Sequence, residues 1–283
     1  MIRAATEADI PQLIRLWQVC FHDEEDTIRM FLQRLNTDVS CRVDERDDRI
    51  VAAAYLVDAR MTTPKGLVPV WYEYALGTLP EYRRQGIMAR LLDSIKKEAR
   101  RRKIPYTALV PAEARLAPYY EKQGYRWFFT LRQVEMPRTW LSRMGENAGA
   151  EIPSREEPDG LRERLLRPLI GSLQWSAPAV TFALQFTEHC GGRVIRVPGG
   201  YAVCHETEDT LHITEWMSTP RTAPMLARRL CEYSDKPKVR LRLTEYNPLF
   251  PGVGEMIHFG MLRSTGGEPL PKPSGAYIGL EMS

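Results

Sequence analysis

The stretch of sequence that decides the fold is Arg83-Arg84-Gln85-Gly86-Ile87-Met88. It follows an apolar run, residues 70–79, and opens a segment, residues 87–103, whose apolar side chains recur every three or four positions. This order predicts a strand, a basic turn that contains glycine, and a helix that begins near Gly86. The first backbone N–H groups of a helix lack acceptors inside the helix and lie at the positive end of its dipole. The turn is therefore predicted to bind an anionic group such as phosphate.

The basic residues around this helix have two different explanations. The run from Lys96 to Lys103 lies on the outer face and in the last turn, where the helix dipole favours cations without any ligand. Arg83 and Arg84 precede the helix, where the dipole disfavours cations, so a bound anion would explain them. No P-loop pattern and no G-x-G-x-x-G pattern is present. The predicted phosphate site is therefore of another kind.

The residues after this helix complete a recognisable pattern. Residues 105–111 are expected to form a short strand, residues 116–123 a short helix and residues 125–130 another strand. The segments TLPEYRRQGIM, residues 78–88, and YYEKQGY, residues 119–125, strongly resemble the GNAT acetyltransferases. The pattern of that family is Arg or Gln, two residues, Gly, one residue, Gly or Ala, and later Phe-Tyr-x-Lys-x-Gly-Phe. The apolar Ile87-Met88 looks like the branch of the mycobacterial enhanced-intracellular-survival acetyltransferases, which have tandem GNAT units.

Two residues depart from the family pattern. Met88 stands where Gly or Ala is usual, which changes packing under a pyrophosphate and leaves its backbone donors in place. Glu113 stands where many members carry an Asn that touches the pantetheine arm. The resemblance therefore predicts the phosphate cradle more firmly than it predicts contacts from the loop at Glu113.

Composition indicates an intracellular globular protein of two domains. The chain has 283 residues, of which 43% are hydrophobic and 27% charged, enough to form a core in each of two domains. The five cysteines are widely spaced without a metal-binding pattern, so we expect reduced thiols and no metal. No apolar run could span a bilayer and no signal peptide is recognised, so we expect a cytoplasmic protein without a membrane partner. The net charge of +3 is too small and dispersed for nucleic-acid binding.

The domain boundaries are read from composition and from an internal echo. Residues 142–160 are polar and rich in Gly and Pro, which is typical of a connector. Segments before it are echoed after it: Glu73-Tyr74 resembles Glu215-Trp216, and the residues at 87–92 resemble those at 225–230. We predict an α/β fold of tandem GNAT-like units, each a mixed, mostly antiparallel sheet flanked by helices. The domains are 1–140, binding acetyl-CoA, a linker 141–159, and a degenerate GNAT-like domain 160–283; chance similarity of strand-helix-strand patterns is the alternative.

The second copy is not expected to hold a pyrophosphate. Its turn before Met225 is shorter, and Pro224 stands in place of Gly86, which removes a backbone N–H that the cradle needs. It also lacks the tyrosine-bearing helix, because residues 247–252 form a Pro/Gly loop.

The resemblance implies the chemistry of acetyl transfer from acetyl-CoA, without a metal. In the family, the strand before the cradle supplies backbone groups for the acetyl carbonyl and pantetheine, which correspond here to Leu76, Gly77 and Thr78. The cradle corresponds to Arg83, Arg84, Gln85, Gly86, Ile87 and Met88. Tyr120 matches the acid of the family, since a phenol with a pKa of about 10 stays protonated at neutral pH and can donate to a departing thiolate. Packing beside Tyr119 and Tyr125 is the alternative role for Tyr120.

The base that takes the proton of the amine has several candidates. Glu73 is on the strand before the cradle, and alternation places it on one face with Trp71, Ala75 and Gly77, so it is our candidate catalytic base. A structural carboxylate paired with an arginine is an equal alternative, because Glu215 occupies the matching place in the second copy. In the resembled branch some enzymes use their C-terminal carboxylate, here that of Ser283, and His22 is a third candidate.

The acceptor is predicted only as a class. The acidic residues Asp23, Glu24, Glu25 and Asp26 near a probable helix start favour a cationic amine if they face the pocket, although helix-end reasons also explain them. Small-molecule or peptide amines fit this description, and the oligomeric state is open. We therefore predict an acyltransferase, an N-acetyltransferase acting on a primary amine; a non-catalytic acyl-CoA-binding regulatory protein is the alternative.

Overall fold

The computed structural model of the chain describes residues 1–150 and 155–280. The chain divides into two compact units. Unit 1 contains Met1–Phe128 together with Gly260–Pro271, and unit 2 contains Phe129–Phe259 together with the chain from Lys272 onward.

The strands of unit 1 form a mixed sheet in the order β1-β2-β3-β4-β5-β12. Neighbours pair antiparallel except β4 and β5, which are parallel. The strands are β1 (Ile2–Ala4), β2 (Val39–Arg46), β3 (Arg49–Thr63), β4 (Gly66–Thr78), β5 (Tyr106–Leu109) and β12 (Glu255–Ser264). The segment of β12 that pairs with β5, Met261–Ser264, follows almost the whole of unit 2 in the sequence.

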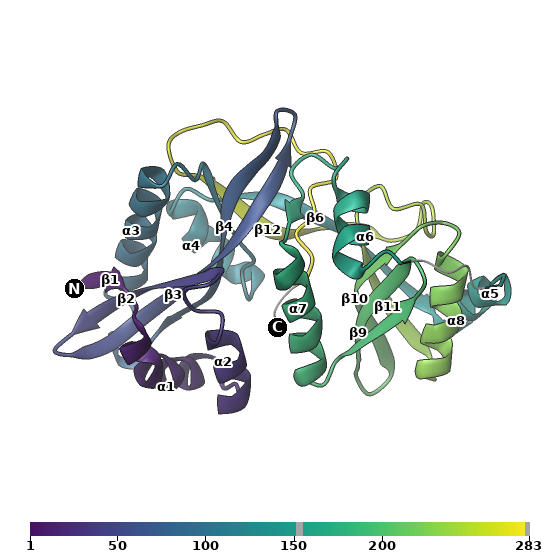
Figure 1. The fold of residues 1–283 in the computed structure, drawn as a ribbon, viewed down its shortest axis with the longest axis horizontal. Helices are drawn as coiled ribbons and strands as arrows, with labels where there is room; N and C mark the ends of the chain where they lie inside the picture. The colour runs from purple at the N-terminus through teal and green to yellow at the C-terminus, as the bar shows by residue number, and fades with distance from the viewer. Residues whose placement is uncertain (151–154, 281–283) are drawn as a thin grey trace. The chain divides into compact units, whose positions relative to one another are not determined.

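Helices cover both faces of this sheet. On one face lie α1 (Ile10–Phe21) and α2 (Glu25–Leu32), and on the other lie α3 (Ile87–Arg101) and α4 (Ala117–Lys122) (Figure 1). Short 3-10 turns occur at η1 (Glu7–Asp9), η2 (Pro80–Tyr82) and η3 (Ala114–Leu116). The acidic cluster predicted at a helix start is indeed located where α2 begins.

Helix α3 forms for the reason that the sequence indicates. Its apolar residues Ile87, Leu91, Leu92, Ile95 and Ala99 are buried along one stripe, while its basic residues point outward or lie in the last turn. Gly86 is the N-cap, as predicted, so the basic turn directly precedes the helix.

The strands of unit 2 follow a comparable order, β6-β11-β10-β9-β8. Only β10 and β11 are parallel among these neighbours. The elements are β6 (Arg126–Pro137), β7 (Leu173–Gln174), β8 (Arg193–Val197), β9 (Gly200–Glu206), β10 (Thr210–Ser218), β11 (Lys238–Leu243), α5 (Arg138–Glu146), α6 (Pro158–Leu166), α7 (Ala177–His189) and α8 (Ala223–Tyr233). The predicted fold class, α/β with mixed and mostly antiparallel strand pairing in each unit, is confirmed.

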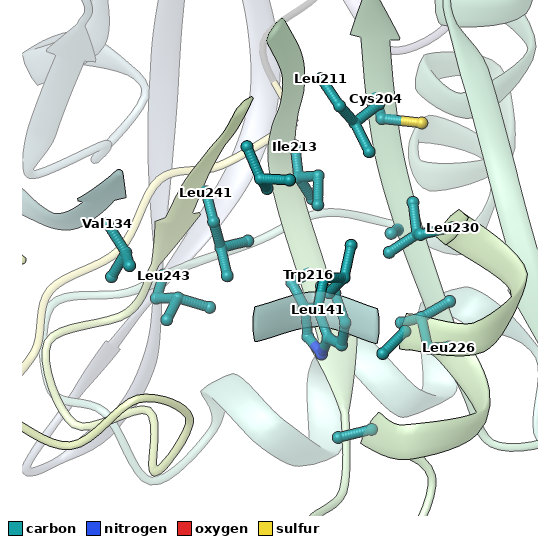
Figure 2. Packing of buried hydrophobic residues seen from close by; sticks show 14 of the residues in the cluster. Val134, Leu141, Cys204, Leu211, Ile213, Trp216, Leu226, Leu230, Leu241 and Leu243 are labelled. Atoms are coloured by element: carbon teal, nitrogen blue, oxygen red, sulfur yellow. The ribbon is translucent and has the colours of Figure 1, made fainter. Parts of the chain in front are cut away.

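The core of unit 2 lies between its sheet and the helix pair α5 and α8. Leu226 and Leu230 of α8 and Leu141 of α5 pack on Trp216 and on inward-facing strand residues (Figure 2). The labelled strand residues in that view are Val134, Cys204, Leu211, Ile213, Leu241 and Leu243. Burial of these side chains removes apolar surface from water and holds the helices on the sheet.

The predicted connector is shorter in the structure than in the sequence analysis. Residues 142–146 continue α5, and α6 begins at Pro158. Gly145 is one of the glycines that made this stretch resemble a connector, but a Cβ there would lie 3.0 Å from the backbone of Arg228, so glycine serves the close approach of α5 to α8. The domain assignments 1–140 and 160–283 stay a prediction, since the compact units are divided at other residues.

All five cysteines are free thiols. Within residues 1–150 and 155–280, none of the helices combines the length and apolar character that crossing a lipid bilayer requires.

Candidate active site

Strand β4 changes its pairing near its end. It pairs with β5 only at Val70, Trp71 and Tyr72, so its remaining residues have no partner in that strand. On the other side, Tyr74 faces Tyr55 and Gly77 faces Ala53, which leaves two residues of β4 opposite one of β3. This is a β-bulge, and Ala75 within it has a positive φ of 46°. The end of β4 therefore presents backbone groups that sheet pairing does not use.

The bulge overturns one prediction about Glu73. Alternation placed Glu73 on one face with Gly77, but the extra residue in the bulge moves Gly77 to the opposite face. A Cβ on Gly77 would lie 3.1 Å from Cys20 Sγ and Leu16 Cδ2 of α1, whereas Glu73 bonds with Arg263, which itself bonds to the Leu92 carbonyl of α3. Glu73 is 1% exposed and does not line the pocket described below.

The turn before α3 has the backbone geometry of an anion cradle. Arg84 and Gly86 both have positive φ, 62° and 71°, so consecutive N–H groups converge. Within the described residues, no oxygen accepts a hydrogen bond from the backbone N–H groups of residues 84–88. Gly86 adopts this conformation without steric cost, whereas Arg84 is strained by it.

Hydrogen bonds from side chains to backbone carbonyl oxygens stabilise the turn. Arg83 Nε donates to the Thr78 carbonyl oxygen at 2.9 Å, which ties the turn to the end of β4. Arg90 Nη1 donates to the Gln85 carbonyl oxygen at 3.0 Å, and Gln85 Nε2 donates to that of Glu81 at 3.2 Å. The guanidinium groups of Arg83 and Arg84 are exposed and line the pocket, where they can meet an anion.

One pocket of about 550 Å³ brings most of the predicted site residues together. The predicted residues that line it are Leu76, Gly77, Thr78, Arg83, Arg84, Gly86, Ile87, Met88 and Tyr120. Gln85 and Glu73 are the predicted residues that do not. Sequence reasoning did not predict the lining roles of Cys20, Tyr82, Arg115, Leu116 and Tyr119, because no local pattern marks residues that reach a pocket from other elements.

Tyr120 borders this pocket from α4. It is 8% exposed and packs edge-to-face against Tyr119 and Tyr125, with ring centroids 5.3 and 5.8 Å away. Burial raises the pKa of the Tyr120 phenol well above its ordinary value, and the nearby charge of Glu73 adds to this effect. The phenol therefore stays protonated at neutral pH.

Other candidate residues lie at or outside the rim. His22 is exposed and ends α1 in a left-handed conformation with φ of 66°. The acidic residues 23–26 are all exposed; Asp23 accepts a hydrogen bond from Trp17 Nε1 at 2.7 Å. Glu113 lines the pocket but is ion-paired with Arg115. Ser283 lies outside the described residues.

Burial raises the pKa of the Cys20 thiol, which also lines the pocket, and the neighbouring Arg83 guanidinium partly opposes this shift. This thiol is therefore largely protonated at neutral pH. Within the described residues, no group of three or more His, Cys, Asp or Glu side chains has the arrangement of a metal site.

Known proteins resemble both the sequence and the fold. The model of the acetyltransferase (GNAT) domain matches residues 1–128. A GCN5-related N-acetyltransferase from Kribbella flavida has 18% sequence identity and a TM-score of 0.70, covering 94% of this chain and 72% of that chain. Eis1 from Mycobacterium abscessus has 16% identity and a TM-score of 0.65, covering 94% and 74%. A tandem GNAT protein from the clavulanic acid biosynthesis pathway has 12% identity and a TM-score of 0.54, covering 95% and 100%. No curated protein matches the chain.

The family match, the cradle and the fold agree with one another. Residues 1–128 match the acetyltransferase (GNAT) domain, and the chain is an acyltransferase enzyme. Its fold is that of the tandem GNAT proteins, as the sequence analysis predicted. Enzymes of this family generally take the acetyl group from acetyl-CoA and pass it to small-molecule or peptide amines.

Proposed function

We propose that this chain transfers the acetyl group of acetyl-CoA to a primary amine, and that it does so in unit 1. The observation that carries the proposal is one pocket of about 550 Å³ in unit 1. It joins unsatisfied backbone N–H groups at a helix N-terminus, the bulged end of β4 and the Tyr120 side chain. A phosphate site, a carbonyl site and a proton donor are the three parts that acetyl transfer from a thioester needs.

Each part of the pocket has a role in this proposal. The N–H groups of residues 84–88 hold the pyrophosphate, with Arg83 and Arg84 balancing its charge. The unpaired backbone of Leu76, Gly77 and Thr78 binds the pantetheine arm and polarises the acetyl carbonyl. As the new C–N bond forms and the C–S bond breaks, Tyr120 gives its proton to the leaving sulfur.

The proton of the amine leaves by a route other than Glu73 in our proposal. Glu73 is buried, hydrogen-bonded to the side chains of Tyr125 and Arg263, and absent from the pocket lining. Glu113 is the one carboxylate among the described lining residues, and it is ion-paired with Arg115. We therefore assign this proton to solvent that enters the pocket. The side chain of His22 at the rim and the carboxylate of Ser283 are the alternative bases to test.

A cationic amine is the proposed acceptor class. The exposed carboxylates of residues 23–26 follow one residue after Phe21, which lines the pocket. They supply negative potential near the place where an acceptor would enter. An amino sugar, a polyamine, an amino-acid derivative and a lysine side chain all satisfy this requirement.

A non-catalytic acyl-CoA-binding protein is the second candidate. The scarcity of unpaired bases among the described lining residues favours it. The two candidates differ in one observable, the release of CoA thiol when an amine is present.

The test is a thiol-release assay with acetyl-CoA and a panel of cationic and neutral amines, run beside titration calorimetry with acetyl-CoA. Acetyl transfer predicts binding, together with release above the hydrolysis rate for at least one cationic amine. Binding without release for any amine would favour the non-catalytic candidate, and absence of binding would contradict both.

A further inference from the structure

A buried polar cluster lies directly behind Tyr120 in unit 1. Its members are Glu73 of β4, Thr107 of β5, Tyr125 just before β6, and Arg263 of β12. Their exposed fractions are between 0% and 2%. Burying an ion pair costs much desolvation free energy, so the contacts that it makes must compensate.

Arg263 is the centre of the cluster. Its Nη2 atom donates to Glu73 Oε1 at 3.1 Å and to the Leu92 carbonyl oxygen at 3.3 Å. Its Nε atom donates to Thr107 Oγ1 at 3.3 Å. Its guanidinium carbon lies 4.4 Å from the centre of the Tyr125 ring. A planar guanidinium with partners in these directions has one orientation.

Tyr125 connects this cluster to the pocket. Its hydroxyl donates to Glu73 Oε2, and its ring contacts both the Arg263 guanidinium and the Tyr120 ring. The Tyr125 backbone N–H also donates to the Tyr120 carbonyl oxygen at 3.1 Å. Tyr125 is thus fixed at its hydroxyl, at its ring face and at its backbone, and the Tyr120 ring packs against this fixed ring in an edge-to-face arrangement.

We infer that Arg263 is a positioning residue for acetyl transfer: by compensating Glu73 and clamping Tyr125, it sets where the Tyr120 hydroxyl stands in the pocket. This inference rests on the proposed function. It also means that the transferase unit is completed by a strand that follows unit 2 in the sequence, beyond the residues 1–128 that match the family domain.

Loss of the guanidinium has a defined consequence. An uncompensated Glu73 carboxylate in a desolvated site either takes up a proton or draws in water. At low pH the carboxyl is neutral and the cluster stays closed, whereas at higher pH its charge disturbs Tyr125 and Tyr120. The Arg263→Met protein therefore loses turnover as pH rises through the pKa of Glu73, a step that the parent lacks.

A comparable pair in unit 2 supplies the control. Arg162 Nε lies 3.3 Å from Glu215 Oε1, both side chains are 1% exposed, and Tyr201 donates to the same carboxylate. Arg162→Met removes a buried cation of the same kind without touching the pocket that contains Tyr120.

The experiment compares Arg263→Met, Arg263→Met with Glu73→Gln, Arg263→Lys and Arg162→Met by thiol release from pH 6 to 9, with calorimetry and thermal melting. We expect Arg263→Met to lower kcat by about tenfold or more at pH 8, with the KM for acetyl-CoA within about twofold. The double variant, Arg263→Met with Glu73→Gln, has no charge at either position and lacks the new pH step. Arg162→Met keeps kcat within about twofold of the parent at temperatures where it is folded.

Some outcomes would overturn the inference. A folded Arg263→Met protein with parental kcat and a parental pH profile would do so, as would an equal loss of kcat in Arg162→Met. If Arg263→Met does not melt cooperatively, Arg263→Lys decides: it keeps the charge and loses the fork, so kcat falls by about fivefold or more, and an unchanged kcat contradicts the inference. A parent that binds acetyl-CoA and releases no thiol with any amine overturns the proposed function and this inference together.

Discussion

The turns that follow β4 in unit 1 and β10 in unit 2 occupy equivalent places in their sheets and differ in what they leave unbonded. In unit 1, the N–H groups of residues 84–88 find no acceptor among the described residues. In unit 2, Ala223 N donates to the Thr219 carbonyl oxygen and Thr222 N to Thr219 Oγ1, and Pro224 has no N–H at all. The proposed anion site is therefore a property of one turn and not of the sheet that carries it.

The two units differ in these turns, but each has a similar buried carboxylate. Glu73 pairs with Arg263 and Tyr125, and Glu215 pairs with Arg162 and Tyr201, with both carboxylates 1% exposed. Unit 2 has the buried carboxylate with its arginine and tyrosine but lacks the cradle. Such a group can therefore have a structural role within its own unit without any cradle beside it. This comparison favours a structural role for Glu73 behind the pocket. It argues against the role of catalytic base, which the alternation of side chains along β4 had suggested.

The largest expected effect concerns Tyr120, which has no counterpart in unit 2 because residues 247–252 form a loop there. Tyr120→Phe keeps the ring and its packing and removes the proton donor, so we expect turnover to fall by about 100-fold to 10,000-fold. Acetyl-CoA binding should change little, because the donor acts when charge gathers on sulfur. Steady-state kinetics with calorimetry checks this, with the exposed Tyr246→Phe as control. Rates within about twofold of the parent would return Tyr120 to a packing role.

The next effect is one of stability in unit 2. Arg162→Met leaves the Glu215 charge buried without its cation, and we expect the free energy of unfolding to fall by about 3 to 5 kcal/mol. The second change Glu215→Gln should recover part of this loss, because neither charge is then uncompensated. Denaturant unfolding of the three proteins measures both values. A loss below about 1 kcal/mol for the single variant would show that this pair is not integral to the unit.

The smallest effect is the response of unit 1 to acid. Arg3 donates to both carboxylate oxygens of Asp9, at 2.7 and 2.8 Å, and so holds the pKa of that carboxyl well below its usual range. Because the pKa is lower in the folded state, the stabilisation is present above about pH 4 and is lost as pH falls further. We expect about 1 to 2 kcal/mol, seen as a steeper loss of stability below pH 4 in the parent than in Asp9→Asn. Parallel curves from denaturant unfolding would contradict this.

Local sequence patterns predicted the parts of the site that depend on neighbouring residues. The start of α3 at Gly86, the strand before it and the tyrosine-bearing helix follow from periodicity, turn residues and one family motif. The bulge at Ala75 was not predictable, because it inserts a residue relative to β3 and leaves no mark in β4 itself. It is also the reason why Glu73 and Gly77 lie on opposite faces. The role of Arg263 was not predicted, because this residue reaches Glu73 from a strand that is distant in sequence. Gly145 was counted with the connector, although glycine is needed there for the close contact between α5 and α8.

The central claim is that one turn in unit 1 makes this chain a single-site acetyl-CoA binder. Titration calorimetry of the parent with acetyl-CoA, beside Gly86→Pro, Gly86→Ala and Pro224→Gly, tests it most directly. We predict one site per chain and a loss of more than about 1.4 kcal/mol, or tenfold in affinity, for Gly86→Pro, since proline cannot adopt the φ of 71° and lacks the N–H. Gly86→Ala keeps the N–H and should lose less, and Pro224→Gly should gain no second site. Two sites in the parent, or unchanged affinity in Gly86→Pro, would contradict the account.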